Sequence, residues 1–214
     1  MAIKAVIFDF DGVVINSEPL YMVAERRLFD QYGIKVPDED WKYFKGTTEN
    51  DFYQLIMAKY QINTDVHKLI EDGRRYIKEE FNKGVDYLPG FLDFWQCIDG
   101  RYRTGLVTST SASFLEWVFR NTPVRNIFDL IITADDVYQA KPHPEPYLKA
   151  FESLRVRPEE CVIIEDSMTG IQAAIASGAV TIGFRCDRND RDMPKLHFYA
   201  DNYTEIANIL SKIG

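Results

Sequence analysis

Short segments made almost entirely of apolar residues alternate with segments of helical length from residue 89 to the end of the chain. The predicted strands are 104–108, 129–133, 161–165 and 179–184, together with the apolar run that leads to Asp9, and the predicted helices are 91–98, 113–121, 146–154, 168–177 and 205–213. Apolar strands without polar alternation are typical of parallel sheets that are buried on both faces. The pattern therefore predicts an α/β fold with a doubly wound, Rossmann-like parallel sheet.

Residues 16–87 lack this alternation and show only the apolar spacing of helices. Small or polar residues at 46–48 and 63–64 separate the helical segments from one another. We therefore expect two units. Residues 1–15 and 88–214 would form the α/β core, and residues 16–87 would form an all-helical cap domain inserted directly behind the first strand.

The composition limits the partners of the chain. It has 214 residues, a formal net charge of −8 and three widely separated cysteines. An acidic protein has no broad basic surface, which argues against binding to nucleic acid or to an anionic membrane. The cysteines predict neither a disulfide framework nor a zinc site and fit a reducing, cytoplasmic setting, and no segment has the composition of a signal peptide or a membrane span. We expect a monomer or a small homo-oligomer.

Two aspartates, Asp9 and Asp11, follow the first apolar run in the segment VIFDFDGVV. Residues two apart in an extended backbone point to the same side, so their carboxylates would crowd one volume unless a cation or a shared proton relieves them. The alternative is a turn, because Asp11-Gly12 between apolar runs is also a common turn sequence. The pair is a candidate site with a structural alternative.

Polar residues also follow the later strands. Thr108 and Ser109 end the second predicted strand, Lys141 comes after the third, and Glu165 and Asp166 end the fourth. Ligands of open α/β sheets bind beyond the carboxyl ends of the strands. These residues are therefore predicted to gather with the first aspartates at one edge of the sheet.

Each of these groups also has a structural alternative. The hydroxyls from Thr108 to Ser111 could cap the following helix instead of binding an anion. Lys141 lies in the segment AKPHPEPY and could be an ordinary surface lysine. Glu165 and Asp166 could cap the next helix instead of binding a metal.

Together the groups form the set that phosphoryl transfer requires. A nucleophilic aspartate attacks phosphorus in line, a hard divalent cation neutralises charge, and cationic or hydroxyl donors hold the other phosphoryl oxygens. Oxygen ligands without His or Cys favour Mg²⁺. The histidines at 67, 143 and 197 show no ligand spacing. The sequence therefore predicts a magnesium-dependent phosphoryl-transfer site.

Four motifs in this order give the chain a family resemblance. DFDGV, the strand-terminal Thr108, Lys141-Pro142 and the run EDSMTGIQAA resemble the haloacid dehalogenase superfamily across essentially the whole chain. The resemblance is to its phosphatase and β-phosphoglucomutase-like branch, whose members carry a helical cap after the first motif. The second acid, Asp11, distinguishes phosphate-ester turnover from the dehalogenase and ATPase branches.

The resemblance implies a role for each acidic residue. Asp9 would be the nucleophile that forms an aspartyl-phosphate. Asp11 would protonate the leaving group and later activate water, a role that a carboxyl of raised pKa can perform. Mg²⁺ would be held by Asp9, by the backbone carbonyl of Asp11 and by Asp166, with Glu165 in support.

The resemblance also implies a phosphate-binding set. Thr108 and Lys141 would hold the phosphoryl oxygens, with help from the backbone N–H groups around Phe10 to Gly12 and at Ser109. Asn16 departs from the family, which often has Asp at that position. The departure concerns hinge or turn contacts and leaves the predicted chemistry in place.

The cap departs further from the β-phosphoglucomutases. Those enzymes have a histidine on the first cap helix and a basic residue after a Gly-containing loop, where this chain has Tyr21 and, after Gly46 and Thr47, Glu49. An acid there should repel a second phosphate. Two arginines at 74 and 75 could compensate, or could belong to a solvated helix face. The aromatic residues of the insertion could shape a substrate pocket or fill the core of the cap; they are Tyr21, Trp41, Tyr43, Phe44 and Tyr53.

The leading hypothesis is a Mg²⁺-dependent phosphatase that acts on a small phosphorylated, sugar-like metabolite. The first alternative is a β-phosphoglucomutase-type phosphomutase, which would need a bisphosphate primer. The second is a non-catalytic binding protein on the same fold, against which the intact acids and Lys141 argue.

Overall fold

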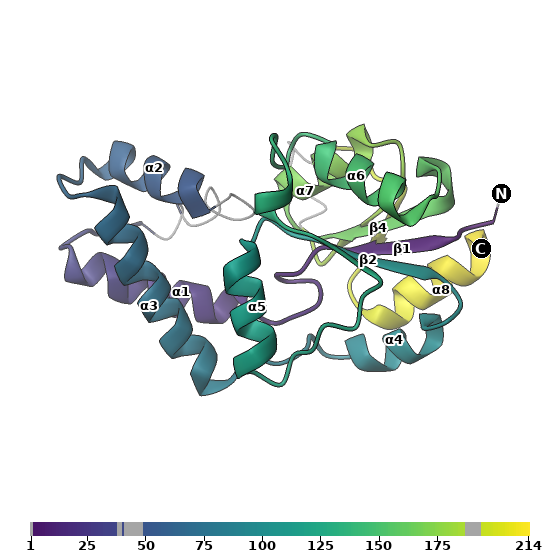
Figure 1. Cartoon of the computed structure of the whole chain (residues 1–214), viewed down its shortest axis with the longest axis horizontal. Coiled ribbons are helices and arrows are strands. Elements are labelled where there is room, and N and C mark those ends of the chain that lie inside the picture. Colours follow the sequence, from purple (N-terminus) through teal and green to yellow (C-terminus); the bar gives the residue numbers. More distant parts are fainter. Residues whose placement is uncertain (1, 38–39, 41–48, 187–193) are drawn as a thin grey trace.

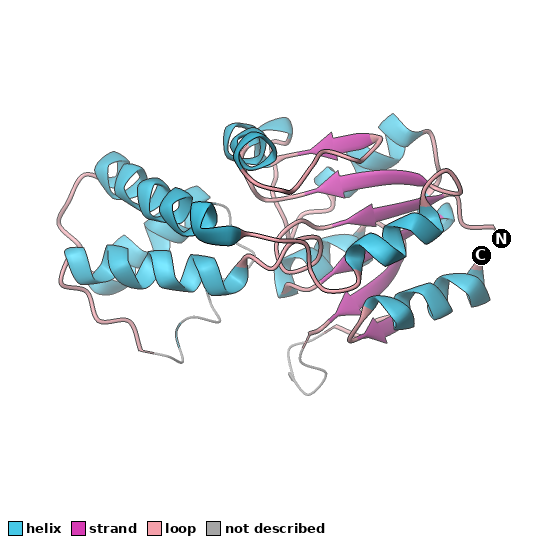
Figure 2. Ribbon diagram, turned by 90° about the horizontal axis from the view of Figure 1, so that it is seen from below, coloured by secondary structure: helices cyan, strands magenta, loops and turns pink. Residues whose placement is uncertain are grey.

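Six parallel strands form one sheet in the order β3-β2-β1-β4-β5-β6 (Figure 2). The computed structural model describes residues 2–37, 40, 49–186 and 194–214. The strands are β1 (Ala5–Phe8), β2 (Arg103–Val107), β3 (Leu130–Ile132), β4 (Cys161–Glu165), β5 (Val180–Phe184) and β6 (Phe198–Ala200). The predicted doubly wound α/β fold is confirmed. Only β6 was not predicted, because this edge strand has three residues, a run too short to be recognised in the sequence.

Helices cover both faces of the sheet (Figure 1). Apolar residues of α4 (Phe91–Ile98), α5 (Ala112–Asn121) and α8 (Tyr203–Ile213) fill one core, and those of α6 (Glu145–Leu154) and α7 (Met168–Ala176) fill the other. Two short 3₁₀ turns, η2 (Ala134–Asp136) and η3 (Pro158–Glu160), complete the connections. β1 serves both cores, because Val6 and Phe8 face the first and Ala5 and Ile7 face the second.

The order of the strands places a topological switch point at the centre of the sheet. β1 pairs with β2 on one side and with β4 on the other. The chain therefore adds β2 and β3 on one side of β1 and then adds β4, β5 and β6 on its other side. In such sheets a crevice forms beyond the carboxyl ends of the two strands at the switch point. The residues that follow β1 and β4 therefore share one edge.

The insertion consists of α1 (Glu18–Gln31), α2 (Glu49–Tyr60) and α3 (Val66–Gly84), which lie at the end of the molecule opposite both termini (Figure 1). Their apolar faces bury a separate cluster of Leu28, Phe29, Phe52, Tyr53, Ile56 and Leu69. The helices expected from the apolar spacing of residues 16–87 are thus present as α1, α2 and α3. Residues 38–39 and 41–48 of this segment lie outside the described residues.

The chain enters and leaves the insertion through two paired segments. Ile15 forms a bridge with Tyr87, the Asn16 N–H donates to the Asp86 carbonyl at 3.1 Å, and the Leu88 N–H donates to the Val14 carbonyl at 2.8 Å. Next to them, the Phe81 ring on α3 packs edge-on against Phe114 on α5, with centroids 5.4 Å apart. The division of the chain into two domains at these segments stays a prediction. Within the described residues, no helix combines the length and apolar character needed to cross a membrane.

Candidate active site

Three carboxylates and one lysine meet where β1 and β4 end. Asp9, Glu165 and Asp166 each offer an oxygen within 4.8 Å of the others. All three acids and Lys141 are buried, with at most 8% of any of these residues exposed. The predicted gathering of strand-terminal residues at one edge therefore occurs for these four.

Lys141 is not a surface lysine. Its Nζ donates to Oδ1 of Asp9 at 2.7 Å, to Oε1 of Glu165 at 2.6 Å and to the carbonyl of Val107 at 2.9 Å. Burial alone would lower the pKa of Lys141, but the carboxylates of Asp9 and Glu165 more than offset it and raise that pKa. The ammonium is therefore charged and uses all three of its protons.

Glu165 accepts hydrogen bonds at both oxygens. Besides Lys141, the Tyr147 hydroxyl of α6 donates to Oε1 at 2.7 Å, and the Ser167 hydroxyl donates to Oε2 at 3.1 Å. The backbone N–H of Asp166 also donates to Oε2, at 3.1 Å. Because its oxygens are engaged in this way, Glu165 orients Lys141 and the start of α7.

Neither acid of this pair is the N-cap residue of α7. The cap of α7 is Ser167, whose Oγ accepts from the Gly170 N–H at 3.1 Å. Gly170 has a second role, because a Cβ there would come within 1.9 Å of the Glu165 carboxylate. The small residue gives the acid the room to lie under the helix.

Gly12 makes similar room for Asp166. Its φ of +73° favours glycine, and a Cβ at this position would lie 2.2 Å from Oδ2 of Asp166. The Gly12 N–H donates to the Ile15 carbonyl at 3.0 Å, so the turn alternative for Asp11-Gly12 is also present. The contact of Gly12 with a phosphate stays a prediction.

Asp11 links the core to the insertion. Its Oδ1 accepts from the Ser17 hydroxyl at 2.6 Å, immediately before α1, and its Oδ2 accepts from the Thr110 hydroxyl at 3.0 Å. Burial raises the pKa of Asp11, and the bonds from Ser17 and Thr110 only partly oppose this effect. A carboxyl with a raised pKa is able to hold a proton that it later donates.

The hydroxyl residues after β2, Thr108 to Ser111, have different roles. Ser111, not Thr108, caps α5, because its Oγ accepts from the Phe114 N–H at 3.4 Å. Thr108 is buried, and its Oγ1 accepts from the Thr110 N–H at 3.0 Å. Ser109 lies beside it and is partly exposed. Thr108 is thus placed within the turn that carries Thr110 to Asp11.

The charge balance of the cluster fits a divalent cation. Burial raises the pKa of Asp9 and the carboxylates of Glu165 and Asp166 raise it further, while Lys141 opposes them. Three buried acids facing one ammonium leave an excess of negative charge, which another cation among their oxygens would relieve. The donors are all hard oxygens, as Mg²⁺ prefers. The residues present therefore fit the predicted metal.

The insertion brings Tyr21 toward this edge. Its ring packs against Phe81 with centroids 5.4 Å apart. Burial raises the pKa of the Tyr21 hydroxyl, and the charge of Asp11 raises it further. Tyr53 is instead buried in the core of the insertion, as one alternative predicted. Gly46 and Thr47 lie outside the described residues, as do Trp41, Tyr43 and Phe44.

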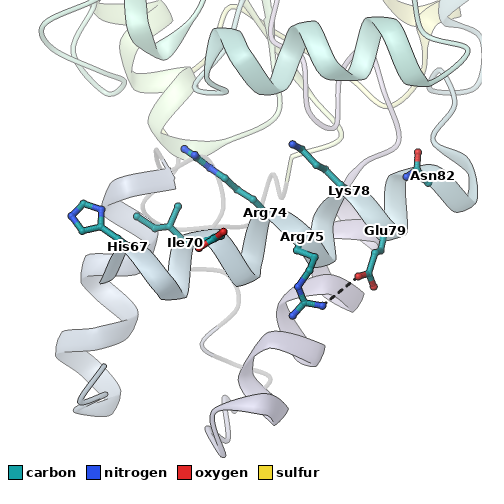
Figure 3. Close-up of a pocket in the computed structure, with 8 residues that line it drawn as sticks. His67, Ile70, Arg74, Arg75, Lys78, Glu79 and Asn82 are labelled. Carbon is teal, nitrogen blue, oxygen red and sulfur yellow. Dashed lines mark hydrogen bonds and ion pairs between the residues drawn. The ribbon is translucent and has the colours of Figure 1, made fainter. Parts of the chain in front are cut away.

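The two arginines of α3 serve different partners. Arg74 donates to Glu49 through Nε at 2.8 Å and Nη2 at 2.5 Å, whereas Arg75 pairs with Asp72 and Glu79 along its own helix. Figure 3 shows the side chain of Arg74 leaving α3 on the opposite side from Arg75. A cavity of about 590 Å³ runs along this helix, and no member of the buried acidic cluster lines it.

Three contributors were not among the predicted site residues: Ser17, Thr110 and Tyr147. Ser17 carries only the signal of a helix N-cap, since it precedes Glu18-Pro19. Thr110 belongs to a hydroxyl run in which the sequence does not distinguish one member from another. Tyr147 lies on the apolar face of α6 and gives no signal beyond that of a core aromatic residue.

Comparison with known proteins places the chain in a family. The family model of the haloacid dehalogenase-like hydrolases matches residues 6–184. A phosphorylated carbohydrates phosphatase from Thermotoga maritima is 31% identical over 82% of this chain and 82% of its own length. A fructose-1-phosphate phosphatase from Escherichia coli is 28% identical over 84% of this chain and 95% of its own.

Solved structures give the same result for the fold. A β-phosphoglucomutase from Clostridium difficile superposes with a TM-score of 0.79 at 22% identity, covering 98% of each chain. The match to the family model includes the segments that carry Asp9, Lys141 and Asp166. The chain therefore belongs to the haloacid dehalogenase-like hydrolase family, in its phosphatase and β-phosphoglucomutase-like branch.

Proposed function

We propose that this phosphoric monoester hydrolase cleaves a small, sugar-like phosphate monoester through an aspartyl-phosphate at Asp9, with Mg²⁺ as its cofactor. The observation that carries the proposal is the buried cluster in which Lys141 holds Asp9 and Glu165 beside Asp166. Named relatives that hydrolyse phosphorylated carbohydrates and fructose 1-phosphate support the substrate class. We further propose that residues 16–87 act as a cap domain over this edge.

In the first step, a carboxylate oxygen of Asp9 attacks phosphorus and the bond from phosphorus to the ester oxygen breaks. Asp11 gives its proton to that oxygen as it leaves, so no alkoxide is released. In the second step, water attacks the phosphoryl group, Asp11 takes up a proton, and Asp9 is regenerated as phosphate departs.

Mg²⁺, held by Asp9, Asp166 and the Asp11 backbone carbonyl with Glu165 in support, would neutralise charge on the phosphoryl oxygens. Lys141 lies against Asp9, so its ammonium would exchange one of its present acceptors for a phosphoryl oxygen, and Thr108 and Ser109 would supply donors from the turn after β2. Ser17 and Thr110 orient Asp11. Tyr147 and Ser167 fix Glu165, and Gly12 leaves room for Asp166.

The proposal is tested by release of inorganic phosphate from a panel of sugar, polyol, glycolate and nucleotide monophosphates, with and without Mg²⁺. We expect turnover of sugar or polyol phosphates only when the metal is present. Glucose 1-phosphate separates the phosphomutase alternative, because a mutase given a bisphosphate primer yields glucose 6-phosphate and a phosphatase yields free phosphate. Absence of release from every ester, aryl phosphates included, would favour the non-catalytic alternative. Location in the cytoplasm and oligomeric state stay predictions.

A further inference from the structure

The last helix of the chain begins at the edge of the sheet that carries the proposed active site. All six strands are parallel, so the helix that follows β6 starts at the same edge as the turn that follows β1. Asn202 caps this helix, α8, because its side-chain oxygen accepts from the Glu205 N–H at 3.0 Å. Tyr203 is the first residue of α8 and is only 3% exposed. A buried tyrosine that is not among the proposed site residues therefore lies at this edge.

The hydroxyl of Tyr203 reaches the turn that follows β1. It donates a hydrogen bond to the backbone carbonyl of Val13 at 2.5 Å, and Val13 is fully buried. The carbonyls of Phe10 and Ile15 accept from backbone N–H groups of the turn itself, whereas the Val13 carbonyl accepts from the side chain of the last helix. A buried carbonyl that loses its hydrogen bond is unfavourable. The conformation of this turn therefore depends on Tyr203.

Packing against buried aromatic rings fixes the direction of this hydroxyl. The Tyr203 ring lies against the rings of Phe91, Phe94 and Phe184, with centroids 5.6, 5.1 and 5.0 Å away. All three phenylalanines are buried, so the tyrosine ring cannot turn away without displacing them. Tyr203 therefore presents a fixed donor to the Val13 carbonyl.

The turn that Tyr203 holds carries part of the proposed metal site. Gly12 lies so close to Asp166 that a Cβ on it would be 2.2 Å from the carboxylate oxygen Oδ2. The backbone carbonyl of Asp11, directly before Gly12, is one of the proposed Mg²⁺ ligands. Because Mg²⁺ demands near-ideal octahedral geometry, a shift of this carbonyl relative to Asp166 would weaken binding of the ion.

The side chain of Asp11 is held by other residues than its backbone. Its carboxylate accepts hydrogen bonds from Ser17 and Thr110, at 2.6 and 3.0 Å. Tyr203 instead acts on the backbone two residues further on, at Val13. Loss of the Tyr203 hydroxyl should therefore disturb the backbone carbonyl of Asp11 more than the proposed acid.

We infer that Tyr203 is a positioning residue for the proposed Mg²⁺ site. It contacts neither the ion nor the substrate. Its hydroxyl holds the turn at Val13 in the conformation in which the Asp11 backbone carbonyl and Asp166 serve one cation. The inference rests on the proposed function, in which these groups bind Mg²⁺. Residues that orient metal ligands typically change metal affinity about 10–100-fold when they are replaced.

Titration of the metal-free protein with Mg²⁺ in an isothermal calorimeter tests this role. Tyr203→Phe removes the hydroxyl and keeps the ring among its neighbours, and it should raise the Kd for Mg²⁺ about tenfold. Phosphate release from p-nitrophenyl phosphate should then need a correspondingly higher Mg²⁺ concentration. With Mg²⁺ in excess, KM and kcat should stay within about twofold of the wild-type values, because the proposed nucleophile and acid are still held.

Two further variants separate this role from a general loss of stability. Tyr32→Phe is the matched control, because it also removes a tyrosine hydroxyl that donates to a fixed acceptor, Asp72 at 2.8 Å, but it lies in the insertion and should leave the Kd unchanged. Phe94→Leu keeps the Tyr203 hydroxyl and loosens the ring that directs it, so it should raise the Kd about threefold. Circular dichroism and thermal unfolding check that each variant is folded at the temperature of the titration.

The outcomes distinguish the inference from the proposed function. A purely structural role would lower the Tm of Tyr203→Phe and leave its Kd for Mg²⁺ at the wild-type value, and this result would overturn the inference. If Tyr203→Phe does not fold, a wild-type Kd in Phe94→Leu contradicts it instead. A wild-type protein that neither binds Mg²⁺ nor releases phosphate from p-nitrophenyl phosphate would contradict the proposed function itself.

Discussion

The charged side chains at the edge of the sheet and those on the insertion differ in how far they are buried. At the edge, the Lys141 ammonium donates all three of its hydrogen bonds to buried acceptors, and its side chain is only 2% exposed. On the insertion, Arg74 is 48% exposed and bound to a single acid. The charges at the edge are therefore buried among their partners, whereas the charge on the insertion remains accessible to solvent.

Replacement of the proposed nucleophile should have the largest effect on this comparison. Asp9→Asn should lower kcat by at least about 10⁴-fold, because the amide cannot attack phosphorus. The fold should persist with an equal or higher Tm, since one of three mutually repelling buried carboxylates is lost. Phosphate release and thermal unfolding measure both parts. A pure variant that retains wild-type turnover would remove Asp9 from the mechanism.

Removal of the metal should abolish phosphate release, because the acids proposed to bind it lie at the edge of the sheet. With EDTA present, phosphate release should fall to background and return when excess Mg²⁺ is added, because three buried acids then face Lys141 alone. Wild-type rates in a metal-free preparation would mean that the acidic cluster is not a metal site. The matched control replaces Mg²⁺ by Ca²⁺, which has the same charge but does not take the small octahedral coordination shell of Mg²⁺.

A pair of lysine and arginine variants compares the two regions directly. Lys141→Met should destabilise the protein by about 3 kcal/mol, because it leaves the buried carboxylates of Asp9 and Glu165 without their cation. Arg74→Met should cost less than about 1 kcal/mol, since its ion pair is exposed. Urea unfolding of the two variants gives both values. Equal losses would contradict the contrast between the regions.

The last prediction concerns the pH dependence of stability. The folded-state pKa of Glu25 is about 8, above its ordinary value of 4.5, so the folded protein binds more protons than the unfolded chain between these values. The stability of the wild type relative to Glu25→Gln should therefore be highest below about pH 4.5 and should fall as the pH rises to about 8. The slope is at most about 1.4 kcal/mol per pH unit. Urea unfolding at several pH values measures it, and a difference that does not vary with pH would mean that Glu25 is not buried in the neutral form.

The sequence predicts the edge better than the insertion, for a physical reason. Parallel strands bring their carboxyl ends together whatever the loops do, so Asp9, Lys141 and Glu165 can be grouped from the strand pattern alone. Tyr147 cannot be assigned in this way, because its hydroxyl reaches Glu165 from an otherwise apolar helix face.

No comparable rule predicts which side chains of the helical insertion lie close together. Glu25 has the same sequence signal as any solvated glutamate of an amphipathic helix, and only its burial in the structure, which raises its pKa, distinguishes it. The pairing of Glu49 with Arg74 joins residues 25 positions apart on two helices, which no local pattern specifies. The family resemblance implies a basic residue where this chain has Glu49, and it named Arg74 only as one of two arginines that could compensate for this acid.

The central claim is that Asp9 carries the phosphoryl group, and one measurement tests it most directly. Asp11→Asn should slow hydrolysis of the phosphoenzyme, so this variant, mixed with Mg²⁺ and p-nitrophenyl phosphate and quenched in acid, should gain the mass of one phosphoryl group. Peptide mass spectrometry should locate the group on Asp9, hydroxylamine should remove it, and the double variant with Asp9→Asn should gain none. Turnover without any such adduct, or an adduct on another residue, would contradict the account.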